Sequence, residues 1–342
     1  MESENDHIEE QSSSHEQPSS IFQHSAEIEM LTEAITAIRK QLSTYIVGQR
    51  KMVDLILTAI LADGHVLLEG VPGVAKTLTA KLIAKSVDTS FSRVQFTPDL
   101  MPSDVTGTTI FNVKSSEFEF KKGPIFANIV LIDEINRSPA KTQAALFEAM
   151  EESQVTADGT KYLFESPFIV LATQNPIEQE GTYRLPEAQL DRFMFKIEVE
   201  YPTAEEEAQI LMQMHAKMNE YKDLSEIEPV ISATKINQLK QVVQELHIEK
   251  GLVKYIAEIV SKTRNHPSLY LGASPRASIA LMQGAKAYAG IQGRSFVTPE
   301  DIKELAYPVL RHRLLLTPEK ELEGITLKET IDSIIEGTEI PR

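Results

Sequence analysis

A loop with two glycines, followed by a lysine and a threonine, contains residue types that can bind phosphate. The loop covers residues 70–75, follows the short apolar run at residues 66–68, and leads into Lys76 and Thr77. Beyond Lys76 apolar residues recur at helical spacing, so the pattern predicts a strand, a loop and a helix in that order. In such a loop the backbone N–H groups can wrap a triphosphate, the lysine can reach the outer phosphates, and the threonine hydroxyl can meet Mg²⁺.

The residue before the lysine departs from the strict phosphate-loop pattern, because this chain has Ala75 where the pattern has glycine. A methyl group is tolerated there if the backbone keeps a negative φ. An ordinary strand-to-helix turn is the competing interpretation, and the predicted strand and helix around the loop disfavour it. The residues expected to bind nucleotide are Gly70, Gly73, Val74, Ala75, Lys76, Thr77 and Leu78.

Two adjacent acids, Asp133 and Glu134, end a second apolar run at residues 129–132. A continuous apolar run suits a strand buried on both faces of a parallel sheet, and ligands of such sheets bind beyond the carboxyl ends of the strands. Asp133 would orient the metal and its waters, while Glu134 would polarise the attacking water. A solvated Asp-Glu turn is the competing interpretation. Asn175 ends the next apolar run and could hold the same water or the outer phosphate, although an Asn before a proline is often only a turn residue.

Size and composition restrict the class of protein. The chain has 342 residues, enough for one large domain and a smaller one, and no cysteine, which excludes disulfides and thiolate metal sites. Its formal net charge of −16 argues against broad nucleic-acid binding and favours a protein partner. Neither a signal peptide nor an apolar run near the roughly 18 residues of a membrane span is evident, so we expect a cytoplasmic protein.

Alternating strand and helix patterns position these groups. Residues 1–25 are rich in Glu, Ser, Gln and His and are expected to form a disordered acidic tail. Strands and helices alternate over residues 26–200, with two hairpins expected at residues 108–121 and 154–165. Residues 201–342 have helical patterns throughout, and the first of these helices begins with a capping box formed by Thr203 and Glu206.

Six stretches of the chain, taken in order, resemble the MoxR family of AAA+ ATPases. They are residues 70–77, 93–104, 132–137, 172–176, 185–193 and 272–277. The resemblance covers about residues 31–313, and alanine before the lysine is the usual form in this family. It implies an α/β AAA+ core, with a five-stranded parallel sheet sandwiched by helices and carrying β-hairpin inserts. An all-α lid domain would follow, with ATP bound between core and lid.

The resemblance also assigns roles to single residues in binding ATP and Mg²⁺. Lys76, Glu134 and Asn175 would act on the phosphates and the attacking water, and Thr77 with Asp133 would hold Mg²⁺. The segment that contacts adenine in the family matches three residues here, Val47, Gly48 and Gln49.

Two arginines match family positions that act on the phosphates. Arg276 matches the sensor 2 arginine, and in the first turn of a lid helix it would swing onto the phosphates when the lid closes; a surface arginine is the competing interpretation. Arg192 matches the arginine finger, which reaches the nucleotide of a neighbouring subunit, against the alternative of a salt bridge beside Asp191. Arg137 and Arg184 remain competitors for such an interface role.

A trans-acting finger requires a homo-oligomeric ring, which the resemblance implies to be a hexamer. Family members act on protein clients, often beside proteins with von Willebrand factor A domains, and some assist metal or cofactor insertion. Two other functions stay open: a DNA-directed motor, because helicases share the hairpins, and a nucleotide-gated scaffold, which the intact Glu134 disfavours. The hairpins could contact a client or simply pack as edge strands.

Overall fold

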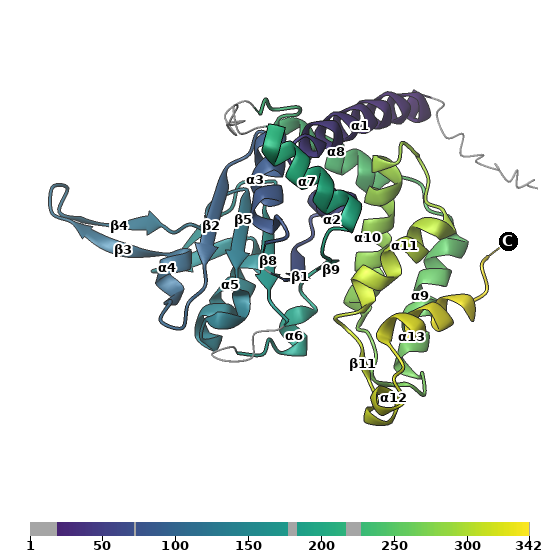
Figure 1. Ribbon diagram of the computed structural model, residues 1–342. Coiled ribbons are helices and arrows are strands. Elements are labelled where there is room, and N and C mark those ends of the chain that lie inside the picture. The colour runs from purple at the N-terminus through teal and green to yellow at the C-terminus, as the bar shows by residue number, and fades with distance from the viewer. Residues whose placement is uncertain (1–18, 72, 177–182, 217–226, 342) are drawn as a thin grey trace, which may run out of the picture.

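A five-stranded parallel sheet forms the centre of the computed structural model, which describes residues 19–71, 73–176, 183–216 and 227–341 (Figure 1). The strands follow the order β2–β5–β8–β1–β9. They are β1 (Val66–Gly70), β2 (Phe91–Gln95), β5 (Ile129–Asp133), β8 (Ile169–Gln174) and β9 (Phe195–Val199). Because all five run in the same direction, their carboxyl ends share one edge of the sheet, the carboxyl edge, and their starts share the opposite amino edge.

Both faces of the sheet are buried, which explains the continuous apolar runs. On β5, Ile129 and Leu131 belong to one core and Val130 and Ile132 to a second core on the opposite face. The first core includes helices α1 (Ser19–Ser43), α2 (Arg50–Leu61) and α3 (Lys76–Ser86), and the second includes α4 (Pro102–Thr106) and α5 (Ala140–Glu152). The expected αβα sandwich is confirmed.

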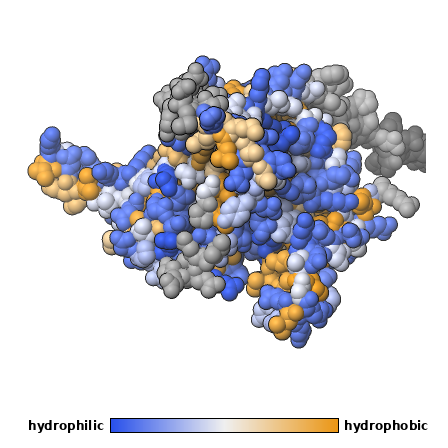
Figure 2. Space-filling view, in the orientation of Figure 1, coloured by the Kyte–Doolittle hydropathy of each residue, from blue (hydrophilic) through white to orange (hydrophobic). Residues whose placement is uncertain are grey.

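Two antiparallel hairpins interrupt the alternation, as predicted. One pairs β3 (Gly107–Asn112) with β4 (Glu117–Lys122), and the other pairs β6 (Gln154–Ala157) with β7 (Thr160–Leu163). The β3–β4 hairpin projects far from the body of the molecule (Figure 1). Its tip has a hydrophobic patch beside hydrophilic side chains (Figure 2), and Val113 and Phe118 are exposed to 81% and 75%.

Helices make up most of the chain after β9. They are α7 (Ala204–Ala216), α8 (Ala233–Glu245), α9 (Lys250–Arg264), α10 (Pro275–Ile291), α11 (Pro299–Leu310), α12 (Pro318–Leu322) and α13 (Leu327–Glu336). The predicted capping box is present, with the Thr203 N–H donating to Glu206 at 2.9 Å and the Glu206 N–H donating to the Thr203 hydroxyl at 3.2 Å. The lid also contains a short antiparallel pair, β10 (Leu269–Leu271) and β11 (Leu315–Leu316). Strands this short leave no periodic signal in a sequence.

The lid packs against the open side of β9 and against α2, and it continues the first core. Gly284 of α10 lies close to both β9 and α11, because a Cβ there would come within 3.2 Å of Phe195 of β9 and of Leu305 of α11. Arg311, at the end of α11, pairs with Glu69 of β1 at 3.3 Å and with Glu198 of β9. Core and lid are therefore joined along β9 and at the end of β1, next to the start of the phosphate loop.

Only part of the N-terminal segment that precedes the sheet lies within the described residues. Residues 1–18 of the expected acidic tail lie outside them, and residues 19–25 form the first turns of α1. Within the described ranges, no helix has both the length and the apolar character that a membrane crossing requires.

His65 links α5 to the sheet at the amino edge. Its Nδ1 accepts the Val170 N–H at 3.0 Å, so Nε2 carries the proton that is shared with the Met150 carbonyl at 3.2 Å. Burial lowers the pKa of His65 from 6.5 to about 4, and burial also lowers the pKa of His312 well below its usual value. Both imidazoles are therefore neutral in the folded protein at neutral pH.

We predict that the free energy of unfolding falls as the pH drops from 7 to 5, with His65 contributing about 2 kcal/mol of the loss. The unfolded chain takes up a proton near pH 6.5, whereas folded His65 resists protonation until about pH 4. Urea unfolding at both pH values should show a smaller decline in His65→Gln and an unchanged decline in His215→Gln, which alters an exposed histidine of α7. An equal decline in His65→Gln would contradict the assignment.

Candidate active site

The phosphate loop begins at the carboxyl end of β1 and turns into α3. A Cβ on Gly70 would clash with the Val199 carbonyl of β9, so the close approach of the strands requires glycine there. Gly73 has a φ of 87°, which glycine adopts without steric cost. Lys76, the first residue of α3, donates from Nζ to the Gly70 carbonyl at 2.5 Å. The lysine thus lies across the loop, and Pro72 is outside the described residues.

The backbone at Ala75 does not have the negative φ at which a methyl group is tolerated without strain, because the residue has φ 57° and ψ 18°. Ala75 is the N-cap of α3, and its carbonyl accepts the N–H and the hydroxyl of Thr79 at 2.9 and 3.0 Å. The turn from β1 into α3 imposes this left-handed conformation whichever side chain is present. For an alanine the strain is about 1 kcal/mol.

Lys76 is partly desolvated beside acidic groups. Burial lowers the pKa of its ammonium, while Asp133, Glu134 and Glu69 act in the opposite direction. The charged ammonium form of Lys76 is therefore less favourable in the free protein than it is in water. An anionic ligand on the loop would add the missing stabilisation, as a phosphate does at this position in phosphate loops.

Asp133, the last residue of β5, forms an ion pair with the side chain of Arg93. Its Oδ2 accepts from Nε of Arg93 at 2.6 Å, its Oδ1 accepts from the Thr173 hydroxyl at 3.2 Å, and its side chain is only 10% exposed. Arg93 and Thr173 were not predicted as site residues. The pairing of β2 and β8 with β5 brings them to the acid, and a single sequence does not give that pairing.

Glu134 follows Asp133 and is held by three side chains. Its Oε2 accepts from Nε2 of Gln95 at 2.8 Å and forms an ion pair with Arg137 at 2.9 Å, and its N–H donates to the Thr173 hydroxyl at 3.0 Å. Gln95 was also not predicted. Its position opposite Asp133 in the β2–β5 register is the signal that could have found it, had the strand order been known.

Other predicted ligands lie at the same edge. Asn175 follows β8, the strand between β5 and β1, and is therefore between the acids and the phosphate loop. Gln49 donates to the Glu200 carbonyl at 3.1 Å, just beyond the end of β9. Gly48 lies so near Glu206 that a Cβ would clash with its carboxylate. The remaining predicted nucleotide residues occupy the loop or its flanks: Val47 before this turn, Val74 buried in the loop, and Thr77 and Leu78 in the first turn of α3.

The residues at the carboxyl edge fit Mg²⁺. Thr77 and Asp133 supply oxygen donors, and Mg²⁺ at phosphoryl-transfer sites is typically held by one or two carboxylates together with substrate phosphates and water. The ranges that the structure describes contain no cluster of three or more His, Cys, Asp or Glu side chains suited to a metal. Asp133 already lies against a positive charge, that of Arg93, which a cation could replace.

Arg192 and Arg276 lie at the amino edge, across the sheet from these groups. Arg192 precedes β9, in a turn where the Met194 N–H donates to the His65 carbonyl at 2.8 Å. Arg276 is in the first turn of α10, and both guanidiniums pair with Glu151 near the end of α5. A five-residue strand separates the two edges by about 15 Å.

The resemblance predicts that Arg276 swings onto the phosphates bound by its own chain. In the structure Arg276 instead lies at the amino edge, opposite the phosphate loop of the same chain. The physical reason is the docking of the lid: α10 packs against α2, and its N-terminus is directed to the amino edge. Nothing in the local sequence of residues 272–277 specifies on which side of the sheet the lid docks.

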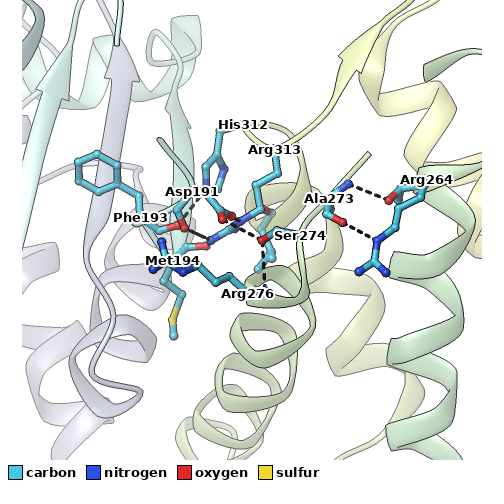
Figure 3. A network of polar contacts seen from close by, with 11 residues as sticks. Asp191, Phe193, Met194, Arg264, Ala273, Ser274, Arg276, His312 and Arg313 are labelled. Carbon is cyan, nitrogen blue, oxygen red and sulfur yellow. Dashed lines mark hydrogen bonds and ion pairs between the residues drawn. The ribbon is translucent and has the colours of Figure 1, made fainter. Parts of the chain in front are cut away.

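A buried network fixes the two arginine-bearing segments to each other (Figure 3). Arg313, whose side chain is 3% exposed, donates to Asp191 Oδ1 at 2.7 Å and to the Phe193 carbonyl at 2.7 Å. Asp191 Oδ2 accepts from the Ser274 hydroxyl at 2.8 Å, and Ser274 caps α10 by accepting the Arg276 N–H at 3.2 Å. Asp191 therefore pairs with Arg313, and the salt bridge that Arg192 forms is with Glu151.

The competing arginines lie elsewhere. Arg137 pairs with Glu134 at the carboxyl edge, and Arg184 is highly exposed and pairs with Glu187 at 3.2 Å. Of the three arginines considered for an interface role, Arg192 is the one beside Arg276. The two share a cavity of about 230 Å³ with Glu151, Asp191 and Arg313.

Two known families match the chain. Residues 65–195 match the ATPase family associated with various cellular activities (AAA), and residues 261–336 match the AAA lid domain. The first match covers β1, β2, β5 and β8 of the sheet and the phosphate loop, and the second covers the end of α9 and the helices from α10, which carries Arg276, to α13.

Individual proteins match over most of the chain. The chain is 49% identical to the uncharacterized protein YeaC of Bacillus subtilis over 88% of its own length and 93% of that protein. It is 41% identical to Chaperone MoxR1 of Mycobacterium tuberculosis over 93% of its length and 84% of that protein. A crystal structure of a candidate ATPase from Cytophaga hutchinsonii superposes with a TM-score of 0.87 at 42% identity, covering 94% of this chain and 99% of the other.

We predict that Ala75→Gly keeps nucleotide affinity and raises the free energy of unfolding by up to about 1 kcal/mol, because glycine relieves the left-handed strain at a small entropic cost. Ala144→Gly is the matched control, since Ala144 lies exposed inside α5 and the same change there should cost about 1 kcal/mol. Urea unfolding and nucleotide titration measure both effects. Equal destabilisation by the two substitutions would contradict the strain at Ala75.

Proposed function

The chain belongs to the MoxR family of AAA+ ATPases, and from that premise we propose that it uses ATP hydrolysis at the carboxyl edge to remodel or activate a protein client. The observation that carries the proposal is the convergence of Lys76, Asp133 and Glu134 at one edge of the sheet, with Arg192 and Arg276 at the other. The first group can bind and hydrolyse a nucleotide. The second group lies at the opposite edge of the sheet from the phosphate loop of the same chain.

At the carboxyl edge the loop N–H groups and Lys76 would hold the β- and γ-phosphates. Thr77 and Asp133 would hold Mg²⁺, which neutralises the charge that develops on the phosphates. Glu134 would accept a proton from the attacking water, and Gln95 and Arg137 would hold its carboxylate in place. Asn175 would orient the same water from the neighbouring strand.

At the amino edge Arg192 and Arg276 would act in trans. The length of the strands separates these arginines from the phosphate loop of the same chain. They would therefore reach a nucleotide only across a subunit interface. Each subunit would then complete the site of its neighbour, which requires a closed ring, and we propose a hexamer. An arginine supplied in this way can accelerate hydrolysis roughly 10³–10⁵-fold.

A protein client and cytoplasmic location fit the remaining features. The relative named Chaperone MoxR1 supports a chaperone-like role, and the exposed apolar side chains Val113 and Phe118 near the tip of the β3–β4 hairpin form a surface suited to protein contact. A partner with a von Willebrand factor A domain, and metal or cofactor insertion, are finer proposals that follow from the family. The net charge of −16 counts against DNA as the target.

We predict that Lys76→Ala abolishes ATP binding, whereas Glu134→Gln binds ATP normally and fails to hydrolyse it. The lysine contacts the ligand in every state, while the glutamate acts only when water attacks. Calorimetric titration and phosphate release measure the two properties. Lys81→Ala changes an exposed lysine of the same helix and should leave both unchanged; normal turnover in Glu134→Gln would remove Glu134 from its role.

We predict that Arg192→Ala loses at least about 10³-fold in turnover but binds ATP as tightly as the unaltered protein. Mixing Arg192→Ala with Glu134→Gln subunits should restore activity, because one variant keeps an intact acid site and the other keeps intact arginines. The restored phosphate release is measured against each variant alone. Two inactive proteins that stay inactive when mixed, although they co-assemble, would contradict action in trans.

A further inference from the structure

Glu151 is the carboxylate that joins the two arginines of the amino edge. Its Oε2 pairs with Nη1 of Arg192, from the core, and its Oε1 pairs with Nη2 of Arg276, from the lid. Three segments that are distant in the sequence thus meet at one side chain. Neither the sequence patterns nor the family matches assigned a role to Glu151.

The other acidic side chain nearby, Asp191, contacts neither of these two guanidiniums in the described interactions and instead holds two backbone segments in place. Asp191 uses both oxygens for Arg313 and Ser274, which sets the positions of the turn before β9 and of the start of α10. Arg192 has one further anchor, the Phe147 carbonyl at 3.0 Å. For Arg276 the side-chain contact that the structure describes is the one with Glu151.

Charge explains why such a carboxylate is needed. Two guanidiniums that face one cavity repel each other, and the neighbouring Arg313 adds a third positive charge; Arg276 is among the causes that lower the pKa of Arg313, after burial. A bridging carboxylate offsets that repulsion and sets the spacing of the two heads. The three side chains remain 28% to 48% exposed, so the pair is open to a ligand.

The contacts with Glu151 leave donors for an anion. Each guanidinium has five N–H groups in a planar fork, and Glu151 occupies one nitrogen of each. The remaining donors of two forks held side by side suit the oxygens of a terminal phosphate. A phosphate could therefore join the pair without expelling Glu151.

We propose that Glu151 is a positioning residue that holds Arg192 and Arg276 together as one receptor for the γ-phosphate of ATP bound to the neighbouring subunit. The inference rests on the proposed action of these arginines in trans. Glu151 itself does not touch the nucleotide. Its removal leaves ATP binding intact and loosens the geometry of the arginines.

The first test separates turnover from binding. Glu151→Gln keeps the size of the side chain but has one acceptor oxygen and no charge, so kcat should fall about 10- to 100-fold with an unchanged KM and an unchanged melting temperature. Glu152→Gln is the matched control, since Glu152 is the exposed neighbour and contacts Gln154. Unchanged kcat in Glu151→Gln, or a fall in kcat accompanied by weakened ATP binding, overturns the proposal.

The second test locates the defect by subunit mixing. In a mixture of Arg192→Ala and Glu134→Gln subunits, the productive interface takes its acid site from the former and its arginines from the latter. Glu151→Gln should therefore reduce the restored activity when it is added to the Glu134→Gln subunit, and should have no effect when added to the Arg192→Ala subunit. A purely structural role would reduce activity in both placements.

The outcomes distinguish the two proposals. Restored activity that is insensitive to the placement of Glu151→Gln overturns the role of Glu151 and leaves action in trans intact. No restored activity in the parent mixture, with co-assembly verified, overturns action in trans and the role of Glu151 with it.

Discussion

The polarity of a parallel sheet is the constraint on which the whole account depends. All strands end at one edge, so the loop after β1, the acids at the end of β5 and Asn175 after β8 lie at the same edge because of the strand direction alone. The turns that precede the strands lie at the other edge, and Arg192 belongs to one of them. Because the strands are rigid and buried on both faces, no local movement brings Arg192 to its own phosphate loop. A reaction that needs both edges needs two copies of the chain.

The acids of the carboxyl edge and the two arginines of the amino edge have partners within the described part of the chain. Arg93 compensates Asp133, Gln95 and Arg137 hold Glu134, and Glu151 bridges Arg192 and Arg276. This pattern keeps partly buried charges from being left unpaired, which would be costly. It also means that nucleotide binding and ring closure exchange internal contacts for new ones, so the net gain is smaller than the new contacts alone would suggest.

The sequence predicts what depends on local pattern. The apolar run at residues 129–132 and its acids, the hairpin within residues 154–165, and the capping box at Thr203 all follow from spacing and residue type, and all are present. The left-handed backbone of Ala75 was not predictable in this way, because the turn between β1 and α3 imposes it. The position of Arg276 was missed for a related reason, since it depends on how the lid docks on β9 and α2. Gln95 and Thr173 become site residues only through the strand order.

The most direct test of the account is the ATPase activity per subunit over a range of protein concentrations, with sedimentation velocity on the same samples in Mg²⁺ and ATP. If the two edges of the sheet cooperate only across an interface, activity per subunit rises in parallel with the assembled fraction and is close to zero where the protein is monomeric. Full activity per subunit in samples that sediment as monomers would contradict it.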